Sequence, residues 1–273
     1  MNRTLNNLSR LIILNSIILL VVNSQTLFAQ RYYDVSFPMV AFYADSASVN
    51  KITPDLTNSF FTSDSIAKFA PITYSGSLHM GSHGFFRGNL YLDDHTGTHI
   101  DAPNHFVYKN NDQAKQLSVG ELTVDQLTGP MVFLDMSSRK NRNVYPADIE
   151  PIVDQLQDGA WLVVNFGLAK HYKTKSYSTI DSPGFAQETC QYLANLIDDK
   201  VINITGIGSD NGSTDVTSNF KIPETSCHGI LLSKRNILLI ESMGSLSEIA
   251  KEKGKCELIV APLKIMGGSG SPA

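Results

Sequence analysis

The chain contains 273 residues, of which 42% are hydrophobic and 18% are charged, and its formal net charge is −4. This is enough apolar material for one large domain with a buried core. Because 26 acidic residues outnumber 22 basic ones, the composition does not support binding to a nucleic-acid backbone or an anionic membrane. Three cysteines are too few for a fold held together mainly by disulfides.

Residues 1–29 have the pattern of a secretory signal peptide. Arg3 and Arg10 give the segment a positive start, and an apolar run follows over residues 11–22. The run is shorter than the roughly 20 residues that span a bilayer, although a membrane anchor or a buried first helix is the alternative. We therefore predict that the mature protein is a secreted domain of residues 30–273 that does not bind a membrane.

The segment from His95 to His105 is the most informative part of the sequence, and it contains three of the seven histidines. It reads His-Thr-Gly-Thr-His-Ile-Asp-Ala-Pro-Asn-His, and its glycine and proline disfavour a regular helix. We expect a compact turn that brings together His95, His99 and Asp101. Imidazole and carboxylate groups suit Zn²⁺, Mn²⁺ or Fe²⁺, and three protein ligands leave positions open for water, as in catalytic sites. His105 is then placed to transfer protons. The alternative for the whole cluster is a set of surface histidines or hydrogen-bonded core histidines that bind no metal.

The rest of the chain alternates between strand and helix patterns. Helices are predicted over residues 147–157 and over 183–197, where Ser182 is a suitable N-cap and proline comes first. A capping box at 245–248 predicts a third, short helix. Short apolar runs predict strands buried on both faces. These elements favour an α/β fold, a single domain with a mixed β-sheet or barrel-like core flanked by helices. The predicted strands are 131–135, 161–166, 201–207, 237–241 and 257–263.

The secretory route would allow one disulfide among Cys190, Cys227 and Cys256, but the sequence does not say which two pair. Asn203 and Asn211 begin glycosylation sequons. We expect Asn203 to be silent inside a buried strand and Asn211 to be accessible in a polar loop.

The segment 95–105 resembles the signature of the cyclase-like metal-dependent hydrolases, a family that includes bacterial kynurenine formamidases and isatin hydrolases. Residues 34–38 look like the opening strand of that family, and 206–210 look like its Gly-x-Gly-Ile-Asp strand end, with Ser209 in place of the isoleucine. Residues 261–272 resemble the terminal strand and tail of the animal branch. On this resemblance the chain is identified as an animal-type secreted member.

The resemblance implies a swivelling β/β/α fold and a metal centre built from His95, His99 and Asp101. In two-metal members Asp101 would bridge to a second ion held by His228 and Glu241, so that each chain would bind one or two ions, with Zn²⁺ expected and Mn²⁺ as the alternative. His105 would be the general acid/base. A homodimer is also implied. Glu241 ends an apolar run, where a buried carboxylate needs a metal or, alternatively, a basic side chain as its partner.

The function expected from these features is hydrolysis of the carbon–nitrogen bond of a small-molecule amide by metal-activated water. The resemblance points to arylformamidase activity, which converts N-formylkynurenine to kynurenine, or to hydrolysis of a cyclic amide. Two departures concern the substrate: residues 40–43 lack the tryptophan that family members carry, and Ser242 replaces an asparagine. The alternatives are a catalytically inactive secreted binding protein on the same fold and a non-haem metal oxygenase.

Overall fold

The computed structural model describes residues 36, 42–43, 73–78, 87–106, 116–172, 182–216, 219, 223–252 and 255–273. The predicted signal peptide, residues 1–29, lies outside them, as does the predicted opening strand 34–38 apart from residue 36. Within the described part of the chain, no helix combines the length and the apolar character needed to cross a membrane.

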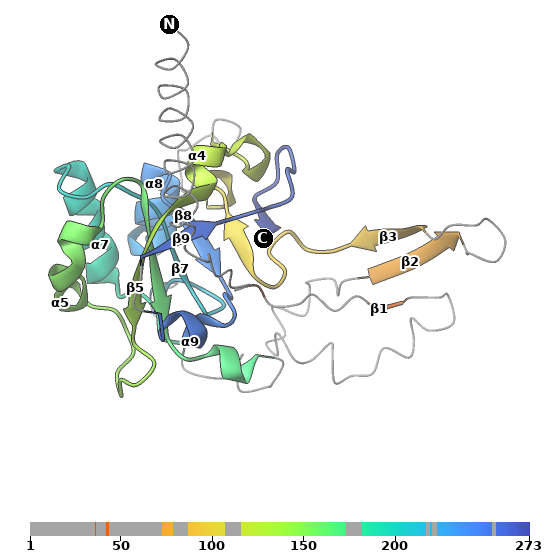
Figure 1. The fold of residues 1–273 in the computed structure, drawn as a ribbon. Helices are drawn as coiled ribbons and strands as arrows, with labels where there is room; N and C mark the ends of the chain where they lie inside the picture. The colour runs from red at the N-terminus through yellow and green to blue at the C-terminus, as the bar shows by residue number, and fades with distance from the viewer. Residues whose placement is uncertain are drawn as a thin grey trace, which may run out of the picture. The chain divides into compact units, whose positions relative to one another are not determined.

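A curled, mixed seven-stranded sheet with the order β10-β4-β8-β7-β6-β5-β9 forms the described domain (Figure 1). Strands β5, β6, β7 and β8 run parallel to one another, whereas β4, β9 and β10 pair in antiparallel fashion. The single α/β domain with a mixed sheet is therefore confirmed. The strands are β4 (His99–Asp101), β5 (Thr128–Asp135), β6 (Ala160–Asn165), β7 (Ile204–Ser209), β8 (Leu238–Glu241), β9 (Cys256–Ile259) and β10 (Gly270–Pro272).

A second sheet has three short strands in the order β1-β2-β3. Strand β1 (Phe42–Tyr43) runs parallel to β2 (Thr73–Leu78), and β2 pairs with β3 (Arg87–Tyr91) in antiparallel fashion.

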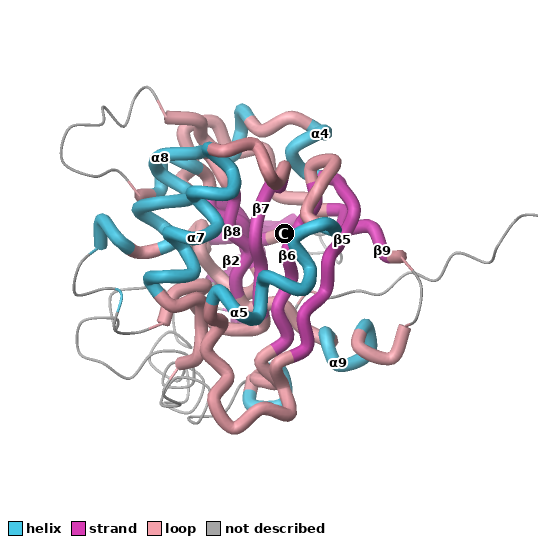
Figure 2. The backbone as a smooth tube through the Cα atoms, turned by 90° about the vertical axis from the view of Figure 1, so that its left-hand side faces the viewer, coloured by secondary structure: helices cyan, strands magenta, loops and turns pink. Residues whose placement is uncertain are grey.

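Helices cover one face of the seven-stranded sheet (Figure 2). They are α5 (Pro146–Ile149) with the 3₁₀-helix η5 (Glu150–Gln155), α7 (Gln187–Asp198) and α8 (Ser233–Arg235). The predicted helix 147–157 thus forms, with its second half in the tighter 3₁₀ geometry. Two further short helices are α4 (Val124–Leu127) and α9 (Leu246–Ile249).

Apolar side chains pack on both faces of the sheet because side chains alternate along each strand. On β6, Leu162 and Val164 belong to the core cluster that includes Leu193 of α7. Their neighbours Trp161 and Val163 belong to a second cluster on the opposite face. All six residues of β6 are buried, as predicted for a central strand. By contrast, β9 at the sheet edge has alternating exposure, so the prediction that it is buried on both faces was wrong.

One predicted helix start and one predicted helix cap differ from the structure. Helix α7 begins at Gln187 rather than at 183, because Phe185 is extended and forms β-bridges with Val144 and Asp215. Helix α9 forms where predicted, but Ser245 adopts a left-handed conformation with φ 51° and its side chain makes no cap hydrogen bond.

The two sequons show the reverse of the expected accessibility. Asn203 is exposed, because β7 begins only at the next residue. Asn211 is buried, and its Nδ2 donates hydrogen bonds to the carbonyls of Pro183 and Ser213 at 2.6 and 2.7 Å. The amide of Asn211 therefore supports the fold instead of being available on the surface.

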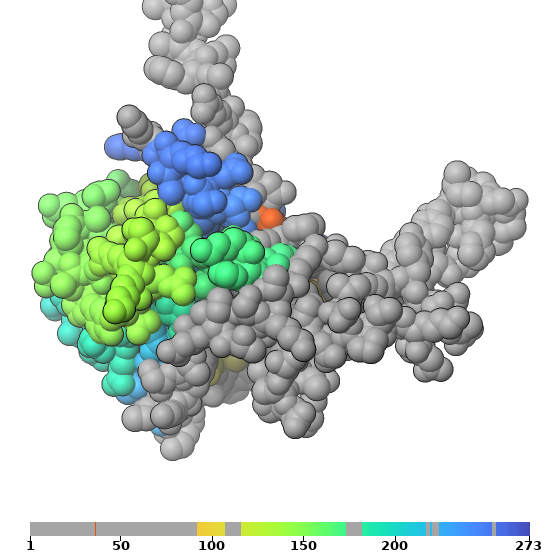
Figure 3. Space-filling model, turned by 90° about the horizontal axis from the view of Figure 1, so that it is seen from below, coloured from red at the N-terminus to blue at the C-terminus, as the bar shows by residue number. Residues whose placement is uncertain are grey.

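The C-terminal part of the chain packs against segments from its middle. The backbone N–H of Gly120 donates to the carbonyl of Ile265, and that of Val260 donates to the carbonyl of Leu127. In Figure 3 the blue C-terminal segment lies beside yellow-green and green segments, so that sequence-distant residues share one surface.

The disulfide joins Cys190 of α7 to Cys227, two residues whose side chains are fully buried. Cys256 lies outside this disulfide, on β9. The structure thus selects one of the three pairings that the sequence left open.

Candidate metal centre

The histidine segment folds as a turn followed by a strand. The side chain of Asp93 accepts the backbone N–H of His95 at 2.8 Å and shapes the turn. His99 and Asp101 are the first and last residues of β4, so their side chains lie on the same face of the strand. His105 ends the 3₁₀-helix η2 (Pro103–His105). A short strand therefore takes the place of the compact turn that we expected to align these ligands.

Two residues far along the chain reach the same point. Strand β8 pairs with β4 so that Glu241 lies directly opposite His99. His228 is the first residue of a π-helix, η9 (His228–Leu232). Short π-helical segments occur frequently at functional sites, because the wider turn redirects a side chain. The structure therefore brings together all five side chains that were predicted as metal ligands.

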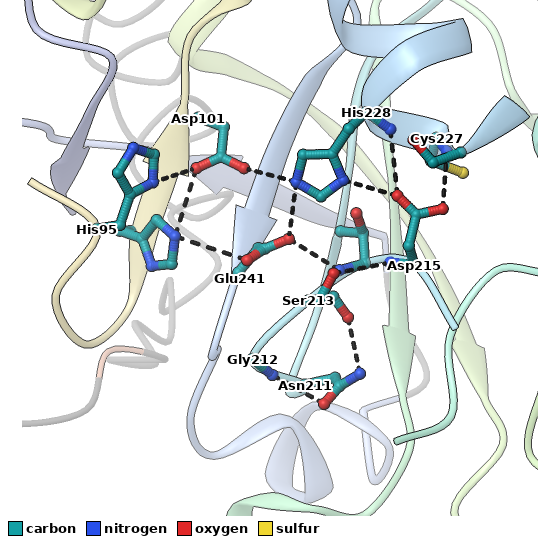
Figure 4. A network of polar contacts seen from close by, with 12 residues as sticks. His95, Asp101, Asn211, Gly212, Ser213, Asp215, Cys227, His228 and Glu241 are labelled. Atoms are coloured by element: carbon teal, nitrogen blue, oxygen red, sulfur yellow. Dashed lines mark hydrogen bonds and ion pairs between the residues drawn. The ribbon is translucent and has the colours of Figure 1, made fainter. Parts of the chain in front are cut away.

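The carboxylate of Asp101 lies at the centre of this group (Figure 4). Its Oδ1 is 2.8 Å from Nδ1 of His95 and 3.3 Å from Nε2 of His99, and its Oδ2 is 3.4 Å from Nε2 of His228. Glu241 closes the group, with its oxygens 3.6 Å from Nε2 of His99 and 3.5 Å from Nε2 of His228. Asp101 is fully buried, and only His95 retains appreciable exposure, at 18% of its side chain.

Hydrogen bonds on the outer nitrogens fix the tautomers of His99 and His228. Nδ1 of His99 donates to the carbonyl of Gly97 at 2.9 Å, and Nδ1 of His228 donates to Oδ2 of Asp215 at 2.6 Å. A neutral imidazole has one N–H and one lone pair. In both residues the lone pair is therefore on Nε2, which faces the central carboxylates.

His95 is held from the C-terminal tail. The hydroxyl of Ser269 donates to Asp94 at 2.8 Å, so its oxygen accepts the N–H of His95 Nε2 at 3.0 Å. This leaves the lone pair of His95 on Nδ1, towards Asp101. Gly270 is required beside this ring, because a Cβ there would lie 2.7 Å from Cε1 of His95.

The donor set fits a divalent cation. Three inward lone pairs face the carboxylates of Asp101 and Glu241, an arrangement that is repulsive unless a metal ion or protons lie between them. Among the described residues, neither oxygen of Asp101 receives a hydrogen bond of acceptable direction, although the imidazoles are close. Two overlapping groups could each hold an ion and share Asp101: one adds His95 and His105, and the other adds His99 and Glu241.

The pKa values of His99, His228 and Glu241 are all raised, so each of these side chains holds a proton more tightly than usual. Burial alone would lower the pKa of His99, but Asp101 and Glu241 raise it to about 9. The pKa of His228 is also raised against the effect of burial, chiefly by Asp101 and Asp215. Burial and the charge of Asp101 raise the pKa of Glu241 to about 7. Protons and metal ions therefore compete for these side chains.

His105 borders the group. Its ring centre is 4.0 Å from that of His95 and 5.8 Å from that of His228. Burial lowers the pKa of His105 to about 4 against the opposing charge of Asp101, and the neighbouring imidazoles add to the lowering. A neutral imidazole in this position can accept a proton, as general acid–base chemistry requires.

Three supporting residues were not found from the sequence: Asp94, Asp215 and Ser269. Asp215 is buried in the polar loop after β7, and nothing in its spacing links it to His228. Ser269 lies in the Gly/Ser-rich tail, which was noted only as a resemblance. Asp210, in the matched 206–210 segment, accepts the backbone N–H groups of Phe166 and Leu168 and so fixes the loop after β6.

Comparison with known proteins places the chain among cyclase relatives. Cyclase-like protein 2 of Oryza sativa subsp. japonica is 25% identical over 183 residues, which are 67% of this chain and 61% of that protein. The isatin hydrolase of Roseibium aggregatum is 29% identical over 206 residues, 69% of this chain and 73% of the relative. The kynurenine formamidase of Bacillus cereus is 29% identical over 185 residues, 68% of this chain and 76% of the relative.

Solved structures share the fold. Isatin hydrolase A from Labrenzia aggregata, bound to benzyl benzoate, aligns with a TM-score of 0.68 at 21% identity, covering 95% of this chain and 96% of that one. A structure described as a potential metal-dependent hydrolase with cyclase activity aligns with a TM-score of 0.56 at 20% identity, covering 88% and 94%. The family model Cyclase, described as "Putative cyclase", matches residues 33–216, which are more than half of the chain. The chain therefore belongs to the Cyclase family.

Proposed function

We propose that the protein is a metal-dependent hydrolase that cleaves the carbon–nitrogen bond of a small amide. The observation that carries this proposal is the set of three imidazoles whose outer nitrogens are held by hydrogen bonds and whose inner nitrogens face Asp101. The relatives named isatin hydrolase and kynurenine formamidase support a cyclic amide or an aryl formamide as the substrate.

The side chains that would hold the ion are His95, His99, Asp101, His228 and Glu241, with Zn²⁺ proposed and Mn²⁺ as the alternative. Because both oxygens of Asp101 face imidazoles on different sides, the group can accommodate one ion or two that share this carboxylate. A bound cation supplies Lewis-acid polarisation of a carbonyl oxygen and lowers the pKa of water from about 15.7 towards about 7.

The chain's own residues account for the proton movements. His105 is neutral at physiological pH, since burial lowers its pKa to about 4, so it accepts the proton of the attacking water. It returns this proton to the leaving nitrogen as the carbon–nitrogen bond breaks. The products of an N-formyl amine are then formic acid and the free amine, so that one water is consumed, and the formic acid releases its proton to solvent as formate.

Hydrolysis assays with metal analysis test the proposal. Purified protein is assayed for metal by elemental analysis and then incubated with N-formylkynurenine, isatin and a simple aryl formamide. We expect one or two divalent ions per chain and turnover of at least one of these amides, which chelation abolishes and metal restores. Protein that binds no divalent ion, or that turns over equally well after its metal has been removed, would contradict the proposal.

We also propose that residues 1–29 are a secretory signal peptide and that the mature domain is secreted. The arginines at positions 3 and 10, the apolar run at 11–22 and the disulfide between Cys190 and Cys227 support this, because disulfides persist in oxidising compartments. N-terminal sequencing of the protein from the medium should find a start between residues 25 and 30. A start at residue 1 in cell-associated protein would contradict the proposal.

We further propose that the mature protein is an animal-type member of the family, that it forms a homodimer, and that it has no nucleic-acid or membrane partners. The surplus of acidic residues supports the last point. Light scattering during size-exclusion chromatography measures the assembly, and a mass equal to one chain at micromolar concentration would contradict the dimer.

A further inference from the structure

Asp215 lies behind His228, on the side away from Asp101 (Figure 4). Its Oδ2 accepts the N–H of His228 Nδ1 at 2.6 Å and the backbone N–H of His228 at 3.2 Å. Its Oδ1 accepts the backbone N–H of Cys227 at 2.7 Å. One fully buried carboxylate therefore fixes both the ring of His228 and the backbone that carries it.

Asp215 is itself held from the other side. Nδ2 of Asn219 donates to Oδ1 of Asp215 at 2.8 Å and to the carbonyl of Phe185 at 3.0 Å. Phe185 forms a β-bridge with Asp215, and a Cβ on Gly184 would lie 2.5 Å from the carbonyl carbon of Asp215. Because backbone and side chain are both packed, Asp215 offers His228 a fixed point of attachment.

The disulfide anchors the start of η9 covalently to α7. Cys227 directly precedes His228 and is the N-cap residue of η9, and Cys190 lies in α7, 37 residues away in sequence. Cys190, Asp215 and Cys227 lie close enough together to resemble a metal site. Cysteine binds a metal only as a thiolate, however, and the two sulfurs are joined in a disulfide. The arrangement is therefore a support for η9.

We propose that Asp215 is a positioning residue for His228 and that the Cys190–Cys227 disulfide keeps η9 where Asp215 can act. The inference rests on the proposed function, because it takes His228 as a metal ligand. A carboxylate on the outer nitrogen of a ligating histidine fixes its tautomer and orientation and strengthens it as a donor. The disulfide makes this support depend on the oxidised state of the two cysteines.

Metal affinity, measured apart from turnover, tests the proposal. Zn²⁺ dissociation constants of the full mature chain are obtained by competition with a chromophoric chelator. Asp215→Asn should bind Zn²⁺ about 10- to 100-fold more weakly than the wild type, the range found when outer-shell partners are lost. The Cys190→Ala/Cys227→Ala double variant should lose about 10-fold. Cys256→Ala is the matched control, since Cys256 lies outside the disulfide, and its affinity should be unchanged.

Far-UV circular dichroism at the assay temperature separates folding from positioning. If Asp215→Asn does not fold, Asn219→Ala replaces it, because that change removes only one support of Asp215 and should weaken Zn²⁺ binding by a smaller factor. Folded variants with wild-type affinity would overturn the inference and leave the proposed function intact. A wild-type protein that binds no Zn²⁺ is titrated with Mn²⁺ in the same assay, and one that binds neither ion would overturn both.

Discussion

The two sides of the candidate metal centre reach Asp101 by different routes. On one side, His95 and His99 come from the same short segment as Asp101, and the partly exposed His95 is supported by Ser269 of the C-terminal tail. On the other side, His228 comes from a distant π-helix, is buried, and is supported by Asp215 and a disulfide. The first side depends on hydrogen bonds to a terminal tail, whereas the second is covalently anchored within the core.

This difference determines how the ligands should respond to substitution. A candidate ligand that both sides share should matter most, and the partly exposed support, Ser269, should matter least, because water can replace a hydrogen bond there. The same difference decides which of these side chains can be recognised from the sequence alone. The segment 95–105 indicates its candidate ligands by residue type and spacing, whereas His228 and Glu241 are brought to it only by tertiary structure.

The largest effect is expected for Asp101, the carboxylate that faces both sides. Asp101→Asn leaves the size of the side chain unchanged but removes the charge that the ion requires. We expect loss of bound metal and a fall in kcat/KM of about 10³-fold or more, since the ion lowers the barrier by several kcal/mol. Elemental analysis and steady-state kinetics measure both. Glu257→Gln, on the exposed edge of β9, is the control and should behave as the wild type; an Asp101→Asn variant with full metal content would contradict the assignment.

His105 should behave differently from the ligands. His105→Ala is expected to lower kcat by about 10²- to 10³-fold through loss of proton transfer, while the metal content stays that of the wild type. Elemental analysis of the same sample used for kinetics gives the comparison. Unchanged kcat would remove the general acid–base role, and loss of metal would instead make His105 a ligand of the group that also contains His95 and Asp101.

The metal-free protein should lose stability as the pH rises. The pKa of His99 is about 9 in the folded state against 6.5 ordinarily, so its contribution is complete below about pH 6.5 and is lost as the pH passes 9. The pKa of Glu241 is raised from 4.5 to about 7, so its contribution to stability is lost as the pH rises through that lower range. For His99 the change is on the order of 3 kcal/mol.

Thermal unfolding between pH 6.5 and 9.5, with chelator or with Zn²⁺, measures this dependence. With Zn²⁺ bound, the ion replaces the protons and the curve should be flatter, because metal binding releases protons from its ligands. Parallel curves with and without metal would mean that His99 is not a group at which protons and ions compete.

The smallest effect on metal binding is expected on the side of the partly exposed His95. Ser269→Ala removes the acceptor of His95 Nε2 and should weaken metal binding by no more than about 10-fold, the lower limit for an outer partner. Chelator competition measures it against Ser247→Ala, an exposed serine of α9. If Ser269→Ala weakens metal binding more than Asp215→Asn does, the expected difference between the two sides is contradicted.

Much of the fold was predictable because periodicity and burial agree. The six-residue apolar run of β6 indicates a central strand, and 147–157 forms a helix on its apolar stripe. Helix α7 was placed four residues early, because the local signal of Ser182 and Pro183 competes with β-bridges made by Phe185, which no local pattern records. The burial of Asn211 was missed for the same reason, since its amide contacts Pro183, 28 residues away, whereas Asn203 is exposed because β7 begins one residue later.

The candidate site divides in the same way. Residue types and spacing indicated His95, His99, Asp101 and His105 as candidates, whereas His228 and Glu241 were named from the family resemblance. Asp215 and Ser269 could not be found, because a supporting side chain shows its role only through the ring that it contacts. The disulfide partner of Cys227 likewise required the packing of α7 against η9.

The most direct measurement is anomalous X-ray diffraction from crystals grown with Zn²⁺, recorded on both sides of the zinc absorption edge. We expect an anomalous peak at bonding distance, about 2.0–2.2 Å, from a carboxylate oxygen of Asp101 and from imidazole nitrogens among His95, His99 and His228. Zinc peaks confined to other places on the molecule, with the space around Asp101 holding only water, would contradict it.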